Sequence, residues 1–98
     1  MNDLYPLCGP HAPHDPEDLA RYVSRVIGRT IRCLRARRGI SQEELGFRAG
    51  LHRNFVGHVE RGEGNPTTRV LVRVAVGLGM PLEDLAAEFR RALAETAI

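Results

Sequence analysis

The chain has 98 residues, of which 43% are hydrophobic, so it is large enough for one small domain with a modest core. Its net charge is +2, it contains only two cysteines, and no apolar run is long enough to span a bilayer. These features argue against a membrane protein and against a disulfide-rich secreted domain, and they indicate a reduced, cytoplasmic protein.

The charge is distributed unevenly along the chain. Residues 1–20 contain four acids and no Arg, and residues 74–98 carry a net charge of −2. Residues 21–73 contain twelve Arg and four Glu, which gives this segment a net charge of +8. The positive charge is therefore concentrated in the middle of the chain.

Residues 1–14, MNDLYPLCGPHAPH, are predicted to form a flexible arm, because they contain three prolines and show no apolar period. Cys8, His11 and His14 supply ligand types that suit zinc. A structural zinc site normally has four ligands and the segment is rich in proline, so we predict no metal and no cofactor. A disulfide between Cys8 and Cys33 is not expected in a reduced compartment.

The first helix is predicted to begin at the sequence DPED, where Asp15 caps the helix and Pro16 occupies its first position. Apolar residues then recur at steps of three and four residues as far as Gly39. Gly28 costs a helix about 1 kcal/mol relative to Ala. The segment before Gly28 is therefore expected either to continue the helix or to form a separate short one.

Two short helices follow, joined by a tight turn. The sequence SQEE at residues 41–44 is a capping box, in which the Ser41 hydroxyl accepts a backbone N–H and the Glu44 carboxylate returns to the cap. This helix is expected to end at Ala49, since Gly50 can supply the positive φ of a turn. The next helix is expected from about His52 to Arg61, before the breaking residues of GEGNP.

The last two helices complete the predicted fold. The fourth runs from about Thr67 to Leu78 and closes at Gly79, and its expected inner residues are Leu71, Val74, Ala75 and Leu78. The fifth begins after Pro81 and carries Leu82, Leu85, Phe89 and Leu93 at helical spacing. With no convincing strands, residues 15–98 are predicted to form a compact all-α domain of five helices.

Two short helices joined by a glycine-containing turn inside a basic segment are typical of a helix-turn-helix. The motifs SQEEL, AGL, VERG, NP and LGMPLEDL, within residues 26–86, resemble those of the phage repressor and Cro family, also called xenobiotic-response-element regulators. The resemblance implies a repressor-like DNA-binding domain. Its second helix would brace on the DNA backbone and its third would enter the major groove.

The resemblance also implies which residues face the bases, namely Arg53, Asn54 and His58. The chemistry of the first two suits this role, since Arg can bind guanine and Asn can bind adenine through two hydrogen bonds each. For His58, an exposed or partly packed histidine is nearly as plausible as a base contact. Glu60 is expected to be structural, because phosphate would repel a carboxylate, and the resemblance implies an ion pair between Arg35 and Glu60.

Further positions are expected to contact phosphate. For Arg38 the alternative is an ordinary interaction with the C-terminus of the first helix. The predicted phosphate contacts are Gln42, His52, Asn65, Thr67, Thr68 and Arg38.

Two departures from the family are Gly46 and Gly57, each of which should weaken its helix by roughly 0.5 to 1 kcal/mol relative to Ala.

The sequence thus predicts a transcriptional regulator that binds double-stranded DNA as a homodimer on a palindromic operator. One recognition helix reaches few base pairs, so specificity requires two half-sites, about 34 Å apart. An exposed apolar patch on the last two helices is the expected dimer interface. Its predicted members are Val72, Val76, Leu82, Phe89 and Leu93.

Several functions fit such a domain. The size of the chain and the segment GLHRNFVGHVERG slightly favour a controller of a restriction-modification system over an antitoxin or a phage-like repressor. The alternative class is a protein-interaction module that keeps the fold as a scaffold and binds a toxin or an RNA polymerase subunit. An enzyme is not expected, since no nucleophile, base and orienting group occur at recognisable spacing.

Overall fold

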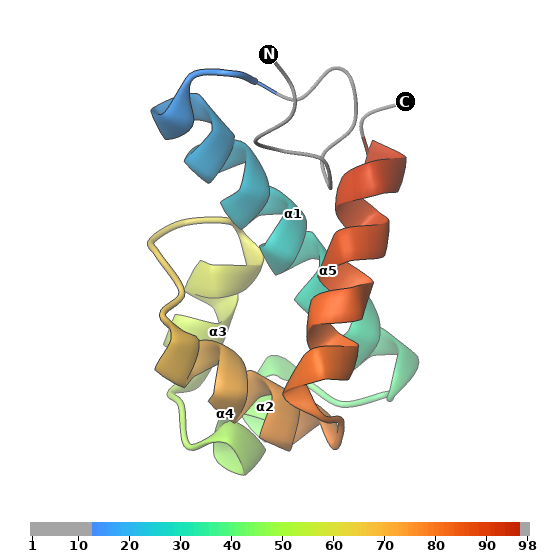
Figure 1. Ribbon diagram of the computed structural model, residues 1–98. Helices are drawn as coiled ribbons and strands as arrows, with labels where there is room; N and C mark the ends of the chain where they lie inside the picture. Colours follow the sequence, from blue (N-terminus) through green and yellow to red (C-terminus); the bar gives the residue numbers. More distant parts are fainter. Residues whose placement is uncertain (1–12, 97–98) are drawn as a thin grey trace.

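In a computed structural model, residues 13–96 form five α-helices, with no strand in this range (Figure 1). The expected arm, apart from residues 13 and 14, lies outside the described residues, as do Cys8 and His11 of the considered zinc cluster. Within the described part, no helix has the length and hydrophobicity to cross a membrane. The helices are α1 (Pro16–Arg37), α2 (Gln42–Ala49), α3 (Arg53–Glu60), α4 (Thr68–Leu78) and α5 (Leu82–Thr96).

The helix boundaries follow from capping side chains, as the sequence predicts. Asp15 accepts the backbone N–H of Asp18 at 3.2 Å, and Ser41 accepts that of Glu44 at 3.0 Å. Half of the predicted capping box is wrong, because the Glu44 carboxylate pairs with Arg48 at 2.8 Å and does not return to the cap. α2 ends at Gly50, which has the predicted positive φ of 71°.

α1 is one continuous helix of 22 residues, so the alternative of two shorter helices is wrong. The reason lies at the contact between α1 and α3. A Cβ atom at Gly28 would lie 2.3 Å from the carbonyl oxygen of Val59 and 2.7 Å from that of Glu60. Gly28 therefore lets the backbone of α1 approach the end of α3, and this packing offsets its poor helix propensity.

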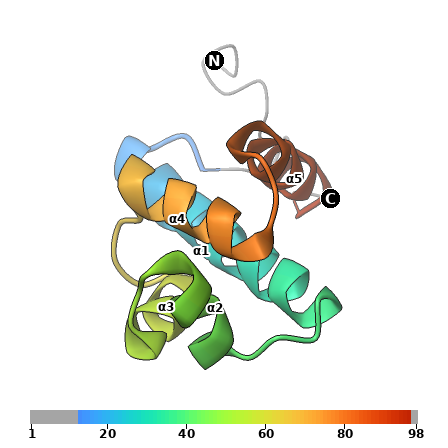
Figure 2. The ribbon, with the colours of Figure 1, turned by 90° about the horizontal axis from the view of Figure 1, so that it is seen from below.

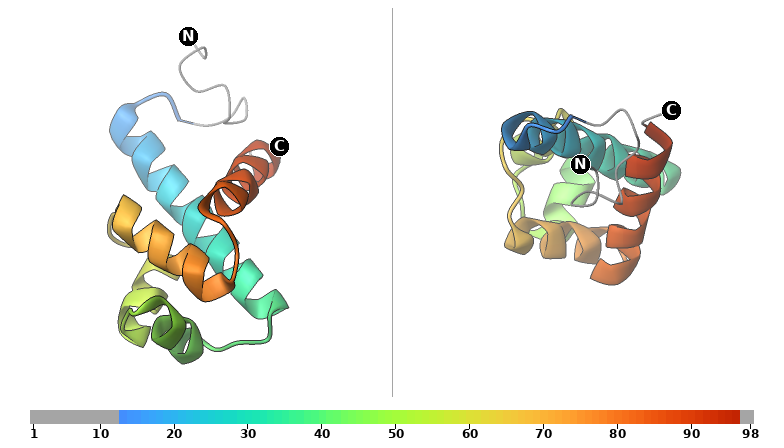
Figure 3. Two further views of the ribbon diagram at one scale, coloured as in Figure 1. Left: turned by 60° about the horizontal axis from the view of Figure 1, so that its bottom comes forward. Right: turned by 45° about the horizontal axis from the view of Figure 1, so that its top comes forward.

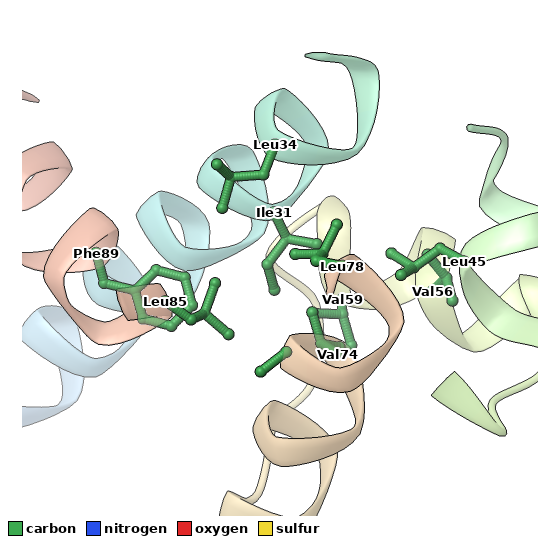
Figure 4. Packing of buried hydrophobic residues seen from close by; sticks show 10 residues of the cluster. Ile31, Leu34, Leu45, Val56, Val59, Val74, Leu78, Leu85 and Phe89 are labelled. Carbon is green, nitrogen blue, oxygen red and sulfur yellow. The ribbon is translucent and has the colours of Figure 1, made fainter. Parts of the chain in front are cut away.

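A single core joins all five helices. α1 contacts α3, α4 and α5, while α2 packs on α3 and α4, and Figure 2 shows α1 crossing the molecule behind α4. Ile31, Leu45 and Leu85 are the largest fully buried side chains. Figure 4 shows how the core residues converge from α1, α2, α3, α4 and α5: Ile31, Leu34, Leu45, Val56, Val59, Val74, Leu78, Leu85 and Phe89.

The predicted apolar patch is only partly present. Val72, Val76 and Leu82 are exposed by 41%, 66% and 38%. Phe89, by contrast, is only 8% exposed, so its placement in an exposed patch is wrong. It lies one helical turn after the fully buried Leu85, on the face of α5 that packs against the core, and Leu93 is half-buried. We define the α4 patch as Val72, Val76 and Leu82.

Replacing Gly28 with Ala is expected to destabilise the protein, although Ala is the better helix former. The added Cβ overpacks the contact between α1 and α3, and overpacking typically costs about 1–3 kcal/mol. Urea unfolding of Gly28→Ala and of Arg32→Ala, an exposed control in the same helix, measures this cost. A Gly28→Ala variant that is as stable as the Arg32→Ala variant would contradict the proposed close contact.

Candidate nucleic-acid interface

The turn between α2 and α3 is tightly packed. The Leu51 N–H donates to the Gly46 carbonyl at 2.7 Å, and a Cβ atom at Gly46 would lie 2.4 Å from the Leu51 carbonyl oxygen. Gly46 therefore permits a close contact between α2 and the turn, which the local helix propensity does not reveal. Figure 3 (left) shows α2 and α3 side by side at one end of the molecule, with α4 above them.

The start of α3 presents the two residues predicted to contact bases. Arg53 and Asn54 are the first residues of α3 and both are exposed. The His52 Nδ1 atom caps the helix by accepting the Asn54 backbone N–H at 3.0 Å. Arg53 Nη1 lies 3.8 Å from Glu43 Oε2, and its side chain is 62% exposed. This long, exposed contact with Glu43 is weak and leaves the guanidinium accessible to a partner.

His58 is held against the loop between α3 and α4. Its ring stacks on Phe55 with a centroid distance of 6.2 Å, and its Nδ1 atom lies 3.2 Å from Glu63 Oε1. A Cβ atom at Gly64 would lie 2.5 Å from the Nε2 atom of the ring. The ring therefore packs partly against its own loop while the side chain stays 42% exposed, which fits the alternative of a partly packed histidine.

The end of α3 is anchored by the ion pair that the resemblance implies, which the structure confirms. Arg35 Nε lies 2.7 Å from Glu60 Oε2, and Arg35 Nη2 lies 3.0 Å from Glu60 Oε1. The Glu60 side chain is only 2% exposed, and its hydrogen bond raises the pKa of Arg35 against the opposing effect of burial. Arg35 Nη1 also donates to the Ile40 carbonyl at 2.9 Å, which ties the α1–α2 loop to the same pair.

The residues predicted to contact phosphate gather at helix N-termini. Gln42 is the first residue of α2, and its Nε2 atom donates to Glu60 Oε1 at 3.0 Å. Thr67 caps α4 by accepting the Val70 N–H at 3.2 Å, while Thr68, Asn65 and His52 are exposed. Helix N-termini attract anions through free backbone N–H groups and the helix dipole, so this placement suits phosphate.

Arg38 does not fit the predicted phosphate contact. Its Nε atom donates to the Leu78 carbonyl at 2.7 Å and its Nη1 atom to the Leu34 carbonyl at 3.1 Å. Its Nη2 atom approaches the Met80 sulfur at 3.8 Å. The guanidinium is therefore used to join the C-terminal ends of α1 and α4, where the last carbonyls of each helix need donors.

Two further residues, Phe47 and Cys33, are exposed on the surface. Phe47 of α2 is 83% exposed, which helical periodicity alone did not predict. The only sequence signal for this exposure of Phe47 was its place between Gly46 and Arg48, outside the apolar stripe of α2.

Cys33 is free and exposed, and the described residues contain no cluster of His, Cys, Asp and Glu that could hold a metal ion.

Comparison with known proteins places the chain beside DNA-binding regulators. Residues 26–89 match the helix-turn-helix domain family. The chain is 37% identical over 65 residues to the HTH-type transcriptional regulator SutR of Escherichia coli (strain K12). That match covers 66% of this chain and 34% of SutR, so the chain spans about a third of that relative's length.

Two further relatives are restriction-modification control proteins. The control protein C.SmaI of Serratia marcescens is 33% identical over 63 residues, which cover 64% of this chain and 75% of C.SmaI. The crystal structure of the controller protein C.AhdI from Aeromonas hydrophila superimposes with a TM-score of 0.61 and 37% identity. The match covers 63% of this chain and 94% of C.AhdI, so most of that controller protein shares its fold with part of this chain.

Replacing Glu60 with Ala is expected to lower the free energy of unfolding by up to about 3–5 kcal/mol, because it leaves the guanidinium of Arg35, whose side chain is 14% exposed, without its carboxylate partner. Glu44→Ala is the matched control, since it removes a carboxylate paired with Arg48 at the surface and should cost less than about 1 kcal/mol. Chemical denaturation of both variants measures how much each ion pair contributes to the free energy of unfolding. Equal losses would show that the buried pair does not anchor α3.

Proposed function

Because the chain belongs to the helix-turn-helix domain family, we propose that it is a sequence-specific DNA-binding transcriptional regulator in the cytoplasm. The observation that carries this proposal is the exposed first turn of α3. Arg53 and Asn54 are exposed there and would meet base edges, while Glu60 anchors the opposite end of the same helix to α1. A rigidly held helix with an exposed, polar start is the arrangement that enters a major groove.

In this proposal Arg53 and Asn54 carry the sequence preference. Arg53 would bind O6 and N7 of a guanine, and Asn54 would bind N6 and N7 of an adenine. His58 would instead stiffen the loop after α3, because its ring is already held by Phe55 and Glu63. Phosphate contacts would come from the starts of the helices and the loop before α4, at Gln42, His52, Asn65, Thr67 and Thr68.

Within this class we propose a controller of a restriction-modification system. The support is that C.SmaI and C.AhdI, which bear control-protein names, match over 75% and 94% of their own lengths. SutR, in contrast, is matched over only 34% of its length. The similarity to the two control proteins therefore extends over most of each molecule.

We further propose that the chain acts as a homodimer on a palindromic operator, with the α4 patch at its two-fold axis. Val72, Val76 and Leu82 are exposed apolar side chains on α4 and at the start of α5. An isologous contact would cover the same patch on both protomers and set two α3 helices at the spacing of successive major grooves.

A second candidate function is binding of a protein partner such as a toxin or an RNA polymerase subunit. Phe47, 83% exposed on α2, would be the apolar side chain for such a contact, but single exposed apolar residues are common on protein surfaces. The two functions differ in their dependence on salt. DNA binding predicts that log affinity falls steeply with log salt, whereas an apolar protein contact does not.

Selection from a random DNA library at a stated salt concentration tests the main proposal, and Arg53→Ala tests its mechanism. The variant is expected to lose about 1–3 kcal/mol of operator binding and to accept any base at one position of each half-site. Thr68→Ala, a predicted phosphate contact, serves as the comparison and should weaken all DNA sequences alike. A uniform loss in Arg53→Ala would make Arg53 a phosphate contact and refute its assigned role.

Replacing Val76 with Asp is expected to produce a monomer at micromolar concentration, because a charge is placed in the centre of the α4 patch. Operator affinity should fall at least tenfold, or about 1.4 kcal/mol, as the second half-site is lost. Phe47→Asp is the control for oligomeric state, since it charges an apolar residue of another helix that is even more exposed, 83% against 66%. Sedimentation analysis that finds the unaltered chain monomeric, both free and on DNA, would refute the dimer.

A further inference from the structure

We propose that the cleft between α1 and α5 binds a small organic anion, one that carries carboxylate or phosphate groups. Figure 1 shows the two helices side by side, and they contact each other in the core. The proposal goes beyond DNA binding and does not depend on it, because every lining residue belongs to α1 or α5. We call this space the α1–α5 cleft, and the residues on which the proposal rests are Arg29, Cys33, Arg37, Glu88, Arg91 and Ala92.

The cleft forms where small side chains of the two helices line the space between them. Cys33 of α1 and Ala92 of α5 are both lining residues, and the space has a volume of about 230 Å³. Arg29 and Arg37 lie one helical turn before and after Cys33, so they occupy the same face of α1 on either side of it. The volume is below the roughly 300–1,000 Å³ of pockets for drug-sized molecules, so it suits a smaller ligand.

The charges of the cleft favour an anion. On α5, Arg91 Nη1 lies 3.1 Å and 3.3 Å from the two carboxylate oxygens of Glu88, so these two charges satisfy each other. On α1, neither Arg29 nor Arg37 has a side-chain hydrogen bond or ion pair within residues 13–96. The other carboxylate of the lining is Glu95, so three guanidinium groups meet two carboxylates. Arg can bind a carboxylate or a phosphate through two parallel hydrogen bonds, so Arg29 and Arg37 are the proposed anion-binding residues.

The apolar part of the lining indicates an organic ligand. Leu34 of α1 lines the cleft and is only 4% exposed as a member of the core, while Ala92 lines it from α5. The carbon atoms of a ligand can cover these two side chains while its anionic groups reach the arginines. Arg29 and Arg37 are about 12 Å apart along the axis of α1, so a dicarboxylate can meet both guanidinium groups and a phosphate monoester only one.

A bound anion is expected to stabilise the folded chain, because it contacts two helices that are separated in the unfolded state. A ligand that binds only the folded state raises the free energy of unfolding as its concentration increases. At ten times its dissociation constant, the ligand should raise the thermal midpoint of a domain of this size by about 5 to 10 °C.

The experiment uses the thiol of Cys33 to report whether the cleft is occupied, because this residue is free, exposed and part of the lining. The Cys8→Ser variant of the full chain leaves Cys33 as its one thiol, since the chain has two cysteines. The rate of alkylation by the neutral reagent iodoacetamide is measured with succinate or glycerol phosphate, and with their neutral analogues succinamide and glycerol, at equal ionic strength. An anion at ten times its dissociation constant should slow alkylation about tenfold, whereas the neutral analogues should not.

Four further variants in the same background test the named residues. Arg29→Gln and Arg37→Gln should each weaken protection by succinate about tenfold, while one of the two should suffice to weaken protection by glycerol phosphate. Ala92→Leu should abolish protection, because it fills the cleft without removing a charge. Arg32→Gln is the matched control, since Arg32 is an exposed arginine beside Cys33 that does not line the cleft. Circular dichroism confirms that each variant is folded.

The site is overturned if none of the compounds slows alkylation, or if each anion and its neutral analogue slow it equally. It is also overturned if neither Arg29→Gln nor Arg37→Gln weakens protection more than Arg32→Gln does. None of these results concerns DNA binding, which is measured separately through the salt dependence of DNA affinity. Failure of the anion site and failure of the proposed DNA-binding function are therefore distinguishable.

Discussion

The buried carboxylate of Glu60 is the constraint on which the rest of the structure depends. A charged group that is 2% exposed is stable only when it is paired and hydrogen-bonded, and here Arg35 and Gln42 supply all of these bonds. These partners come from α1 and from the first residue of α2. One carboxylate at the end of α3 therefore fixes the orientation of α3 relative to both helices.

Backbone approach reinforces this arrangement at two glycines. Gly28 lets α1 approach the Val59 and Glu60 carbonyls, and Gly46 lets α2 approach the turn that leads into α3. Both glycines were expected to weaken their helices, since propensity considers each helix in isolation. The contacts that favour glycine come from residues distant in sequence at Gly28 and from across a turn at Gly46. Helix propensity therefore gives the destabilising effect of each glycine within its own helix, but it does not include the stabilising contact with another part of the chain that the glycine permits.

Features with a local cause were predictable from the sequence, and features that depend on a partner element were not. The caps at Asp15 and Ser41 and the end at Gly50 need only neighbouring residues, and they occur as predicted, while Thr67, expected at the start of the fourth helix, is its cap. The Arg35–Glu60 pair came only from the resemblance. Periodicity placed Phe89 on the apolar face of α5, but it did not show that α1 covers that face. One of the two carbonyls that accept hydrogen bonds from Arg38 belongs to Leu78 of α4, so the sequence did not show this role of Arg38 either.

A recognition helix of eight residues has no stability of its own, because isolated helices shorter than about 12 residues are marginal in water. Its geometry must therefore come from tertiary contacts, which begin after its exposed first turn. Val56, Val59 and Glu60 provide those contacts, which leaves the first turn free to be polar and exposed. In the proposed function, sequence preference and stability are thus assigned to opposite ends of α3, so residues such as Arg53 can change without loss of the fold.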